Sequence, residues 1–80
     1  MFAKLYETEV GQILIKIDGG DKGAEVMVFF EPQGLGVCNV AFNWPELKEY
    51  DQWDNADKVF NEMTKDKAVS VVSSVLSNIM

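Results

Sequence analysis

Hydrophobic and polar positions alternate along the first half of the chain. Ile13, Ile15 and Ile17 alternate with polar residues at 12, 16 and 18, and only Leu14 interrupts the pattern. This period of two places the isoleucines on one buried face of a strand. Residues 24–30 are apolar at nearly every position and rich in β-branched and aromatic side chains. This composition is typical of a strand covered on both faces, so residues 24–30 are predicted to be the middle of a small sheet.

Turn-forming residues separate the predicted strands. Residues 18–23 contain three glycines and two aspartates, which predict a hairpin loop, and residues 31–34 (Glu-Pro-Gln-Gly) predict a second turn. Residues 35–43 then predict an outgoing strand. Residues 2–9 mix apolar and charged positions, and they either extend the first strand or form one of their own. The outgoing strand would carry Cys38, Val40 and Phe42 on one face and Leu35, Val37, Asn39 and Ala41 on the other. An antiparallel meander of three to four strands is expected.

The second half of the chain changes to a helical period. Asp54, with another acidic residue three places on, resembles a capping box and predicts a helix over 54–64, and Asp66 predicts the cap of a second helix over 66–79. The first helix has its apolar positions at Ala56, Val59, Phe60 and Met63, and the second at Val69, Val72, Leu76 and Ile79. The expected fold class is therefore α+β, in which the N-terminal meander is covered by two C-terminal helices.

Length and composition limit the organisation of the chain. Eighty residues predict one domain, 1–80, with a single modest core. Cys38 has no second cysteine to pair with and is expected to be a buried small hydrophobe in a reducing compartment, so the expected location is the cytoplasm. The first residues lack the apolar core of a signal peptide, and no apolar run is long enough for a membrane span.

The net charge of −6 bears on the partner. The charge comes from thirteen acidic residues against seven lysines, with no arginine and no histidine. Binding to nucleic acid needs clustered Lys or Arg, so this balance argues against direct nucleic-acid binding and favours a basic protein partner. The alternative is that the charge only keeps a small protein soluble.

The connector between sheet and helices, residues 44–53, is the most distinctive segment. Large aromatic side chains surrounded by carboxylates are typical of a surface that docks a basic protein, because the aromatics supply contact area and the charges steer the encounter. In the alternative, the two tryptophans close the ends of the core and the charges are merely solvated. The candidate partner-binding residues are Trp44, Glu46, Glu49, Tyr50, Asp51, Trp53, Asp54 and Asp57.

A stripe of small polar residues is the second candidate surface. From Ala68 to Met80 there is no charged residue, and the serines fall on one side of the predicted helix. Small side chains would let another helix approach closely, as in a homodimer; the alternative is a solvated polar face. The candidate self-association residues are Ser70, Ser73, Ser74 and Ser77.

Enzymatic chemistry has little support in the sequence. Histidine, the commonest general base, is absent, and so is arginine, which would clamp an anion. Residues 18–23 do not match the spacing of a calcium loop or of a phosphate-binding loop. No catalytic residue, metal site or cofactor is therefore expected.

In size, acidity, residue usage and expected order of elements, the chain resembles the small proteins with which phages and mobile elements block host factors, anti-CRISPR proteins among them. The resemblance covers the whole chain and includes no motif, so it assigns no residue a role. It implies a stoichiometric inhibitor that occupies a basic nucleic-acid-binding surface, with carboxylates in place of phosphates. A structural protein that self-associates through the serine stripe or a sheet edge is the alternative function.

Overall fold

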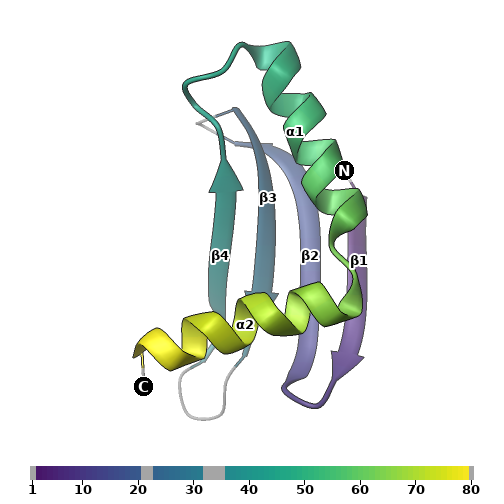
Figure 1. Ribbon diagram of the computed structural model, residues 1–80, viewed down its shortest axis with the longest axis vertical. Helices are drawn as coiled ribbons and strands as arrows, with labels where there is room; N and C mark the ends of the chain where they lie inside the picture. Colours follow the sequence, from purple (N-terminus) through teal and green to yellow (C-terminus); the bar gives the residue numbers. More distant parts are fainter. Residues whose placement is uncertain (1, 21–22, 32–35, 80) are drawn as a thin grey trace.

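Within the part of the chain that the structure describes, four antiparallel strands and two helices form the fold. The computed structural model describes residues 2–20, 23–31 and 36–79. The strands lie in the order β1-β2-β3-β4, so each pairs with its neighbour in sequence. This arrangement confirms the predicted α+β class and shows that residues 2–8 form a strand of their own (Figure 1). The elements are β1 (Phe2–Thr8), β2 (Gly11–Gly20), β3 (Gly23–Phe30), β4 (Cys38–Asn43), α1 (Glu49–Glu62) and α2 (Lys65–Ile79).

The hairpin between β1 and β2 is stabilised by local chemistry. Gly11 opens β2 with a φ of +102°, a conformation that L side chains rarely adopt. The Thr8 hydroxyl donates to the Gly11 carbonyl at 2.7 Å and accepts from the Val10 amide at 3.1 Å. The loop between β2 and β3 is shorter than the six residues predicted for it, because β2 continues to Gly20 and β3 begins at Gly23. Most of the predicted turn at 31–34 lies outside the described residues.

The strand register places the predicted apolar residues on one face. Ile15 lies opposite Val28, and Val28 lies opposite Val40, so alternate residues of three strands line up across the sheet. The predicted buried face of β2 is confirmed. On β4, the face with Cys38, Val40 and Phe42 packs against the core, although Cys38 is half-buried and not fully buried as expected. The buried core consists of Ile13, Ile15, Ile17, Ala24, Val26, Val28, Phe30, Ala56, Phe60, Met63, Ala68 and Val72.

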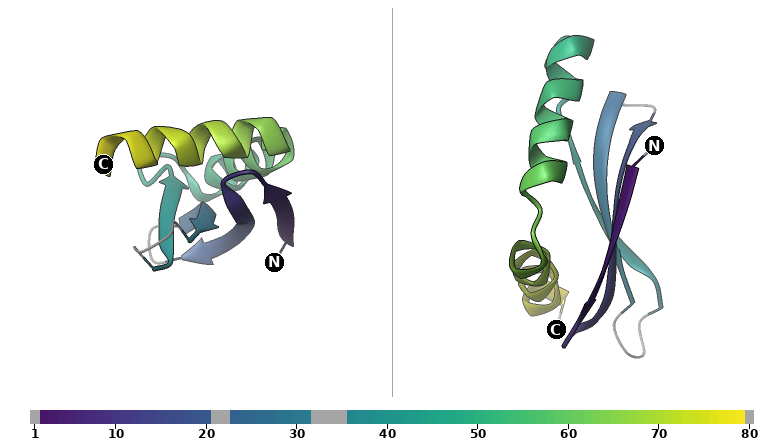
Figure 2. Two further views of the ribbon diagram at one scale, coloured as in Figure 1. Left: turned by 90° about the horizontal axis from the view of Figure 1, so that it is seen from below. Right: turned by 90° about the vertical axis from the view of Figure 1, so that its right-hand side faces the viewer.

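The prediction that β3 is covered on both faces is wrong. Both helices lie on the same face of the sheet (Figures 1 and 2), so along β3 buried residues alternate with half-buried ones, among them Met27 and Phe29. No described segment covers the other face, which we call the open face. There Leu5, Leu14 and Phe29 lie side by side on adjacent strands, and Leu5 is 58% exposed.

The two helices meet the sheet at different angles. Helix α1 runs along the strands, whereas α2 crosses them near the end where β4 begins, and the C-terminal end of α2 projects past β4 (Figures 1 and 2). The predicted cap at Asp66 is wrong, because α2 already begins at Lys65 and the Thr64 hydroxyl accepts from the Lys67 amide at 3.3 Å. The helix therefore starts one residue earlier, on a threonine cap.

Strand β1 supplies the partners for the C-terminal end of α1. A helix leaves its last carbonyls without partners inside the helix and favours positive charge there, yet the last turn of α1 has no basic residue. Lys4 Nζ donates to the Phe60 carbonyl and lies 4.6 Å from the centre of the Phe60 ring. The Tyr6 hydroxyl donates to the Met63 carbonyl at 3.0 Å. These contacts fix the C-terminal end of α1 against the edge of the sheet.

Candidate functional site

The second half of the predicted connector, residues 49–53, is helical. Helix α1 begins at Glu49, and Asp54 lies in its second turn, so the prediction that Asp54 caps the helix and that residues 44–53 precede it is wrong. The actual cap residue, Lys48, has extended backbone angles (φ −67°, ψ 154°) and makes no capping bond with its side chain. Glu49 and Asp51 lie in the first turn, where the helix dipole favours negative charge.

A buried glutamine explains why α1 starts early. Gln52 is 8% exposed, and its amide group joins three segments of the chain. Its Nε2 donates to the Leu47 carbonyl at 2.9 Å, and its Oε1 accepts from the Ala24 amide, at the start of β3, at 3.3 Å. These bonds anchor the first turns of α1 to the sheet, so tertiary contacts replace the missing cap.

The aromatic residues of the segment divide between surface and core. Tyr50 is 77% exposed on α1. Trp53 is 39% exposed, and its ring lies against Gly19 of β2, where an added Cβ would be 3.5 Å from the ring carbon Cζ2. Trp44 is half-buried and packs against the core. The exposure of Tyr50 therefore agrees with the docking hypothesis, and the packing of Trp44 agrees with the alternative that the tryptophans close the core. Trp53 is partly exposed and also packs against the sheet, so it agrees with both.

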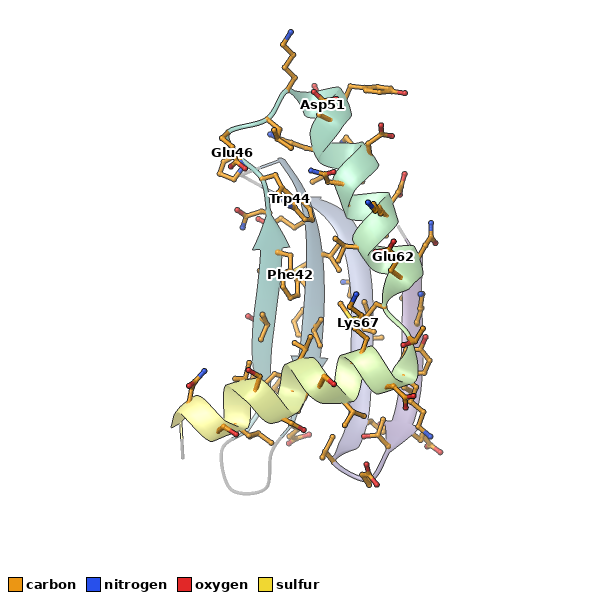
Figure 3. All side chains as sticks on the ribbon, viewed as in Figure 1. Phe42, Trp44, Glu46, Asp51, Glu62 and Lys67 are labelled. Atoms are coloured by element: carbon orange, nitrogen blue, oxygen red, sulfur yellow. The ribbon has the colours of Figure 1, made fainter. Side chains whose placement is uncertain are left out.

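The predicted carboxylates are all exposed: Glu46, Glu49, Asp51, Asp54 and Asp57. Figure 3 places Glu46 and Asp51 at the same end of the molecule although they come from different elements. Tyr50, Asp54 and Asp57 follow at i, i+4 and i+7 on the outward side of α1, so the two carboxylates stand about 6 and 10 Å along the helix axis from the tyrosine.

Two further carboxylates that the sequence did not reveal lie at this end. Asp18 and Glu25 are directly opposite each other on β2 and β3, on the open face, and both are half-buried. Their neighbours Gly19 and Ala24 contact α1, which places the pair at the end of the sheet where that helix starts, although the two side chains lie on the opposite face of the sheet. The strand register alone brings them together, and it is not readable from composition. We call Asp18, Glu25, Glu46, Glu49 and Asp51 the acidic end.

The serine stripe is on the outer side of α2. Ser70, Ser73, Ser74 and Ser77 are all exposed, and the Ser77 hydroxyl donates to the Ser73 carbonyl at 3.0 Å within the helix. The stripe is not uniform, because Ser70 and Ser74 border a hollow that the other two do not. The four serines therefore form two pairs, with Ser70 and Ser74 beside the hollow and Ser73 and Ser77 away from it.

That hollow is a shallow apolar groove between β4 and the helices. One part, of about 380 Å³, lies over Phe42 beside α2, and an adjoining part, of about 240 Å³, continues toward the end of α1. Figure 3 shows Phe42 and Lys67 on its two sides, with Glu62 nearby. We call it the corner groove, and its apolar lining is Phe42, Val59, Met63, Val71 and Val75.

Metal sites and membrane-spanning helices are two further features that could indicate a function. Within residues 2–20, 23–31 and 36–79, no group of three or more His, Cys, Asp or Glu side chains is placed to hold a metal ion. Of the helices in this part of the chain, none has the length and apolar character needed to cross a membrane. Comparison with protein-family models, curated proteins and solved structures gave no match to this chain.

Proposed function

We propose that this protein is a small non-enzymatic binding module that docks through its acidic end and the outer side of α1 on a basic surface of a host protein. The chemistry of that surface is that of a nucleic-acid-binding site, which the carboxylates occupy in place of phosphates. Such a module acts as a stoichiometric inhibitor of the kind that phages and mobile elements use. The absence of histidine from the sequence supports a non-enzymatic role.

One observation carries the proposal, namely that exposed carboxylates from separate elements lie at the same end of the molecule as an exposed aromatic residue. Glu46 comes from the segment after β4, whereas Glu49 and Asp51 come from the first turn of α1, and all three are exposed. Tyr50, 77% exposed, lies between Glu49 and Asp51 in the first turn of α1. A tyrosine rimmed by charge is a common composition for an interface anchor, because the ring supplies contact area at a low cost in side-chain entropy.

The pairing of Asp18 with Glu25 gives further support. Like charges directly opposite on neighbouring strands destabilise a sheet, by roughly 0.2–1 kcal/mol for a pair of this kind. A lysine or arginine from a partner would relieve this repulsion and gain attraction from both carboxylates. The arrangement lowers the stability of the free chain slightly and raises its affinity for a cationic surface.

The competing explanation is that the charges serve helix stability and solubility. Glu49 and Asp51 are well placed for the helix dipole, and that role needs no partner. The two explanations differ in what a charge reversal does. If the carboxylates only stabilise α1, reversal weakens the fold and leaves binding unchanged, whereas a docking surface loses its partner with only a small change in stability.

The experiment is affinity capture from host-cell lysate with the purified chain as bait, at low salt and at about 1 M salt, where the Debye length is about 3 Å. Wild type is expected to retain a nucleic-acid-binding protein at low salt and to release it at high salt. The variant Glu49→Lys/Asp51→Lys is expected to lose that protein, and Tyr50→Ala to weaken its retention. Thermal unfolding of each variant checks that the fold persists.

A matched control changes the same number of charges elsewhere. Glu9 and Glu31 are exposed and lie where β1 and β3 end, far from the start of α1 (Figure 1). Glu9→Lys/Glu31→Lys therefore has the same net charge as Glu49→Lys/Asp51→Lys and should keep the partner. Equal retention by both double variants would refute docking through the acidic end, and equal loss would show that only net charge matters.

A further inference from the structure

Two long stretches without charge, far apart in the sequence, meet at one side of this molecule. Residues 32–45 and residues 68–80 contain none of the seven lysines and thirteen acidic residues. The first stretch includes all of β4, and the second includes most of α2. In the fold, α2 crosses the sheet and passes over β4 (Figures 1 and 2). A chain of net charge −6 therefore has one side from which charge is nearly excluded.

The strand on that side, β4, has an open edge. Among the residues that the structure describes, the strand order is β1-β2-β3-β4, and β4 pairs with β3 only. Every second residue of an edge strand points its backbone N–H and C=O away from the sheet, where another strand can pair with them. Natural edges are commonly protected by charged residues or proline, but the six residues Cys-Asn-Val-Ala-Phe-Asn of β4 contain neither.

Helix α2 supplies a cover for such an added strand. Its C-terminal end projects past β4 (Figures 1 and 2), so the side of the helix that faces the sheet extends beyond the last strand. Val75 and Leu76, in this part of the helix, are only half-buried. A strand placed beside β4 would lie beneath the projecting end and complete the burial of these side chains.

The geometry points to a second copy of this chain as the occupant, and we propose a two-fold dimer in which β4 pairs antiparallel with β4 of its partner. In each chain, α2 crosses the sheet near the Cys38 end of its own β4. Because the partner's β4 runs in the opposite direction, the partner's α2 would cross near the Asn43 end of the first chain's β4. The corner groove over Phe42 lies toward that end and is left open by the chain's own helices. The projecting end of the partner's α2 covers it.

Charge selects a second copy over a basic partner. Two chains of net charge −6 repel each other, so they can associate only through a side that keeps their carboxylates apart. The uncharged side does this, because neither β4 nor the part of α2 after Lys67 offers a carboxylate to attract lysines or arginines. Glu62, which lies near the corner groove, comes from α1. The dimer does not depend on the proposed docking function, because the acidic end and β4 are different surfaces.

The test is sedimentation equilibrium of the full chain over a concentration range that extends to hundreds of micromolar. The expected species has twice the 9.0 kDa mass of one chain. In Ala41→Glu, the new carboxylate projects from the exposed side of β4, opposite or diagonal to its copy in the dimer, and it should raise the dissociation constant by at least about tenfold.

The chain contains a closely matched control. Ala3, Lys16, Met27 and Ala41 form one row across the open face, so Ala3 occupies on the β1 edge the position that Ala41 occupies on the β4 edge. Both alanines are exposed, and Ala3→Glu should leave the dimer intact. A wild-type chain that stays monomeric would overturn the proposal. Equal weakening by the two variants would also overturn it, because association through the open face predicts that result.

A second pair of variants tests the helix contribution. Ser74 borders the corner groove and Ser73 does not, although both are exposed on α2. Ser74→Glu should weaken the dimer because it places a carboxylate where the partner's helix would pack, whereas Ser73→Glu should have little effect. If the two serine variants weaken the dimer equally, the predicted position of the partner's α2 is wrong.

Discussion

Gly23 and Gln52 form a coupled pair that positions α1. Substituting each residue alone and both together tests whether their effects on stability are coupled. A Cβ added at Gly23 would overlap Oε1 of Gln52 and would lie 2.7 Å from its Cδ. Gly23 also has a φ of +94°, which is strained for any L residue. Gly23→Ala therefore has two separate costs, one from the backbone and one from the glutamine.

The two costs can be estimated from the structure. The backbone strain is about 1–2 kcal/mol. To make room, Gln52 must move and release the Ala24 amide, which it now holds at 3.3 Å, and a buried amide left without a partner costs about 1–3 kcal/mol. Gly23→Ala should thus lower the free energy of unfolding by about 2–5 kcal/mol in wild type. In a Gln52→Ala background only the strain remains, so the two substitutions couple by about 1–3 kcal/mol.

The assay is urea unfolding of wild type, both single variants and the double variant, followed by circular dichroism. Gly11→Ala is the control, because Gly11 has a similar φ of +102° and nothing within 4 Å of an added Cβ, so its cost measures strain alone. Gly23→Ala should cost more than Gly11→Ala. Additive effects of Gly23→Ala and Gln52→Ala, with equal costs at the two glycines, would refute the reasoning.

Two other substitutions have predictable effects on stability. Tyr6→Phe removes the hydroxyl that donates to the Met63 carbonyl, so we expect a loss of about 1 kcal/mol and a melting temperature lower by about 4–8 °C in a thermal scan. Asp18→Asn removes one of the paired like charges opposite Glu25, and it should raise the free energy of unfolding in low-salt urea titrations by about 0.2–1 kcal/mol. A loss of stability in Asp18→Asn would show that the charge of Asp18, whose carboxylate accepts a hydrogen bond from the Gly19 amide at 2.8 Å, stabilises the fold more than its repulsion from Glu25 destabilises it.

The sheet was largely predictable because its signal is local. The alternation of Ile13, Ile15 and Ile17 fixes which side of β2 is buried, and the structure follows it. Periodicity likewise identified Ala56, Phe60 and Met63 as core positions of the helical half. What the pattern could not show is how many layers cover the sheet. Apolar residues on both sides of β3 predicted a cover on each face, but both helices lie on one face, and Met27 is left half-exposed.

The start of α1 was not predictable from local rules. Asp54 has a good capping signature, whereas Lys48, which occupies the cap position, has none. The helix begins at Glu49 because Gln52 bonds to Ala24, twenty-eight residues away in the sequence. Such a contact overrides local propensity and leaves no trace in a single sequence. The candidate carboxylates could be identified from the sequence. That Asp18 lies at the same end of the molecule could be seen only in the fold.

The most direct test of the docking proposal is a competition measurement with the captured host protein and a labelled nucleic-acid duplex that it binds. Fluorescence anisotropy of the duplex is followed as the chain is added. Wild type should displace the duplex at a one-to-one ratio to the host protein, and Glu49→Lys/Asp51→Lys should not. If the duplex stays bound while the chain is also bound, the acidic end does not occupy the nucleic-acid site, and the proposal is wrong.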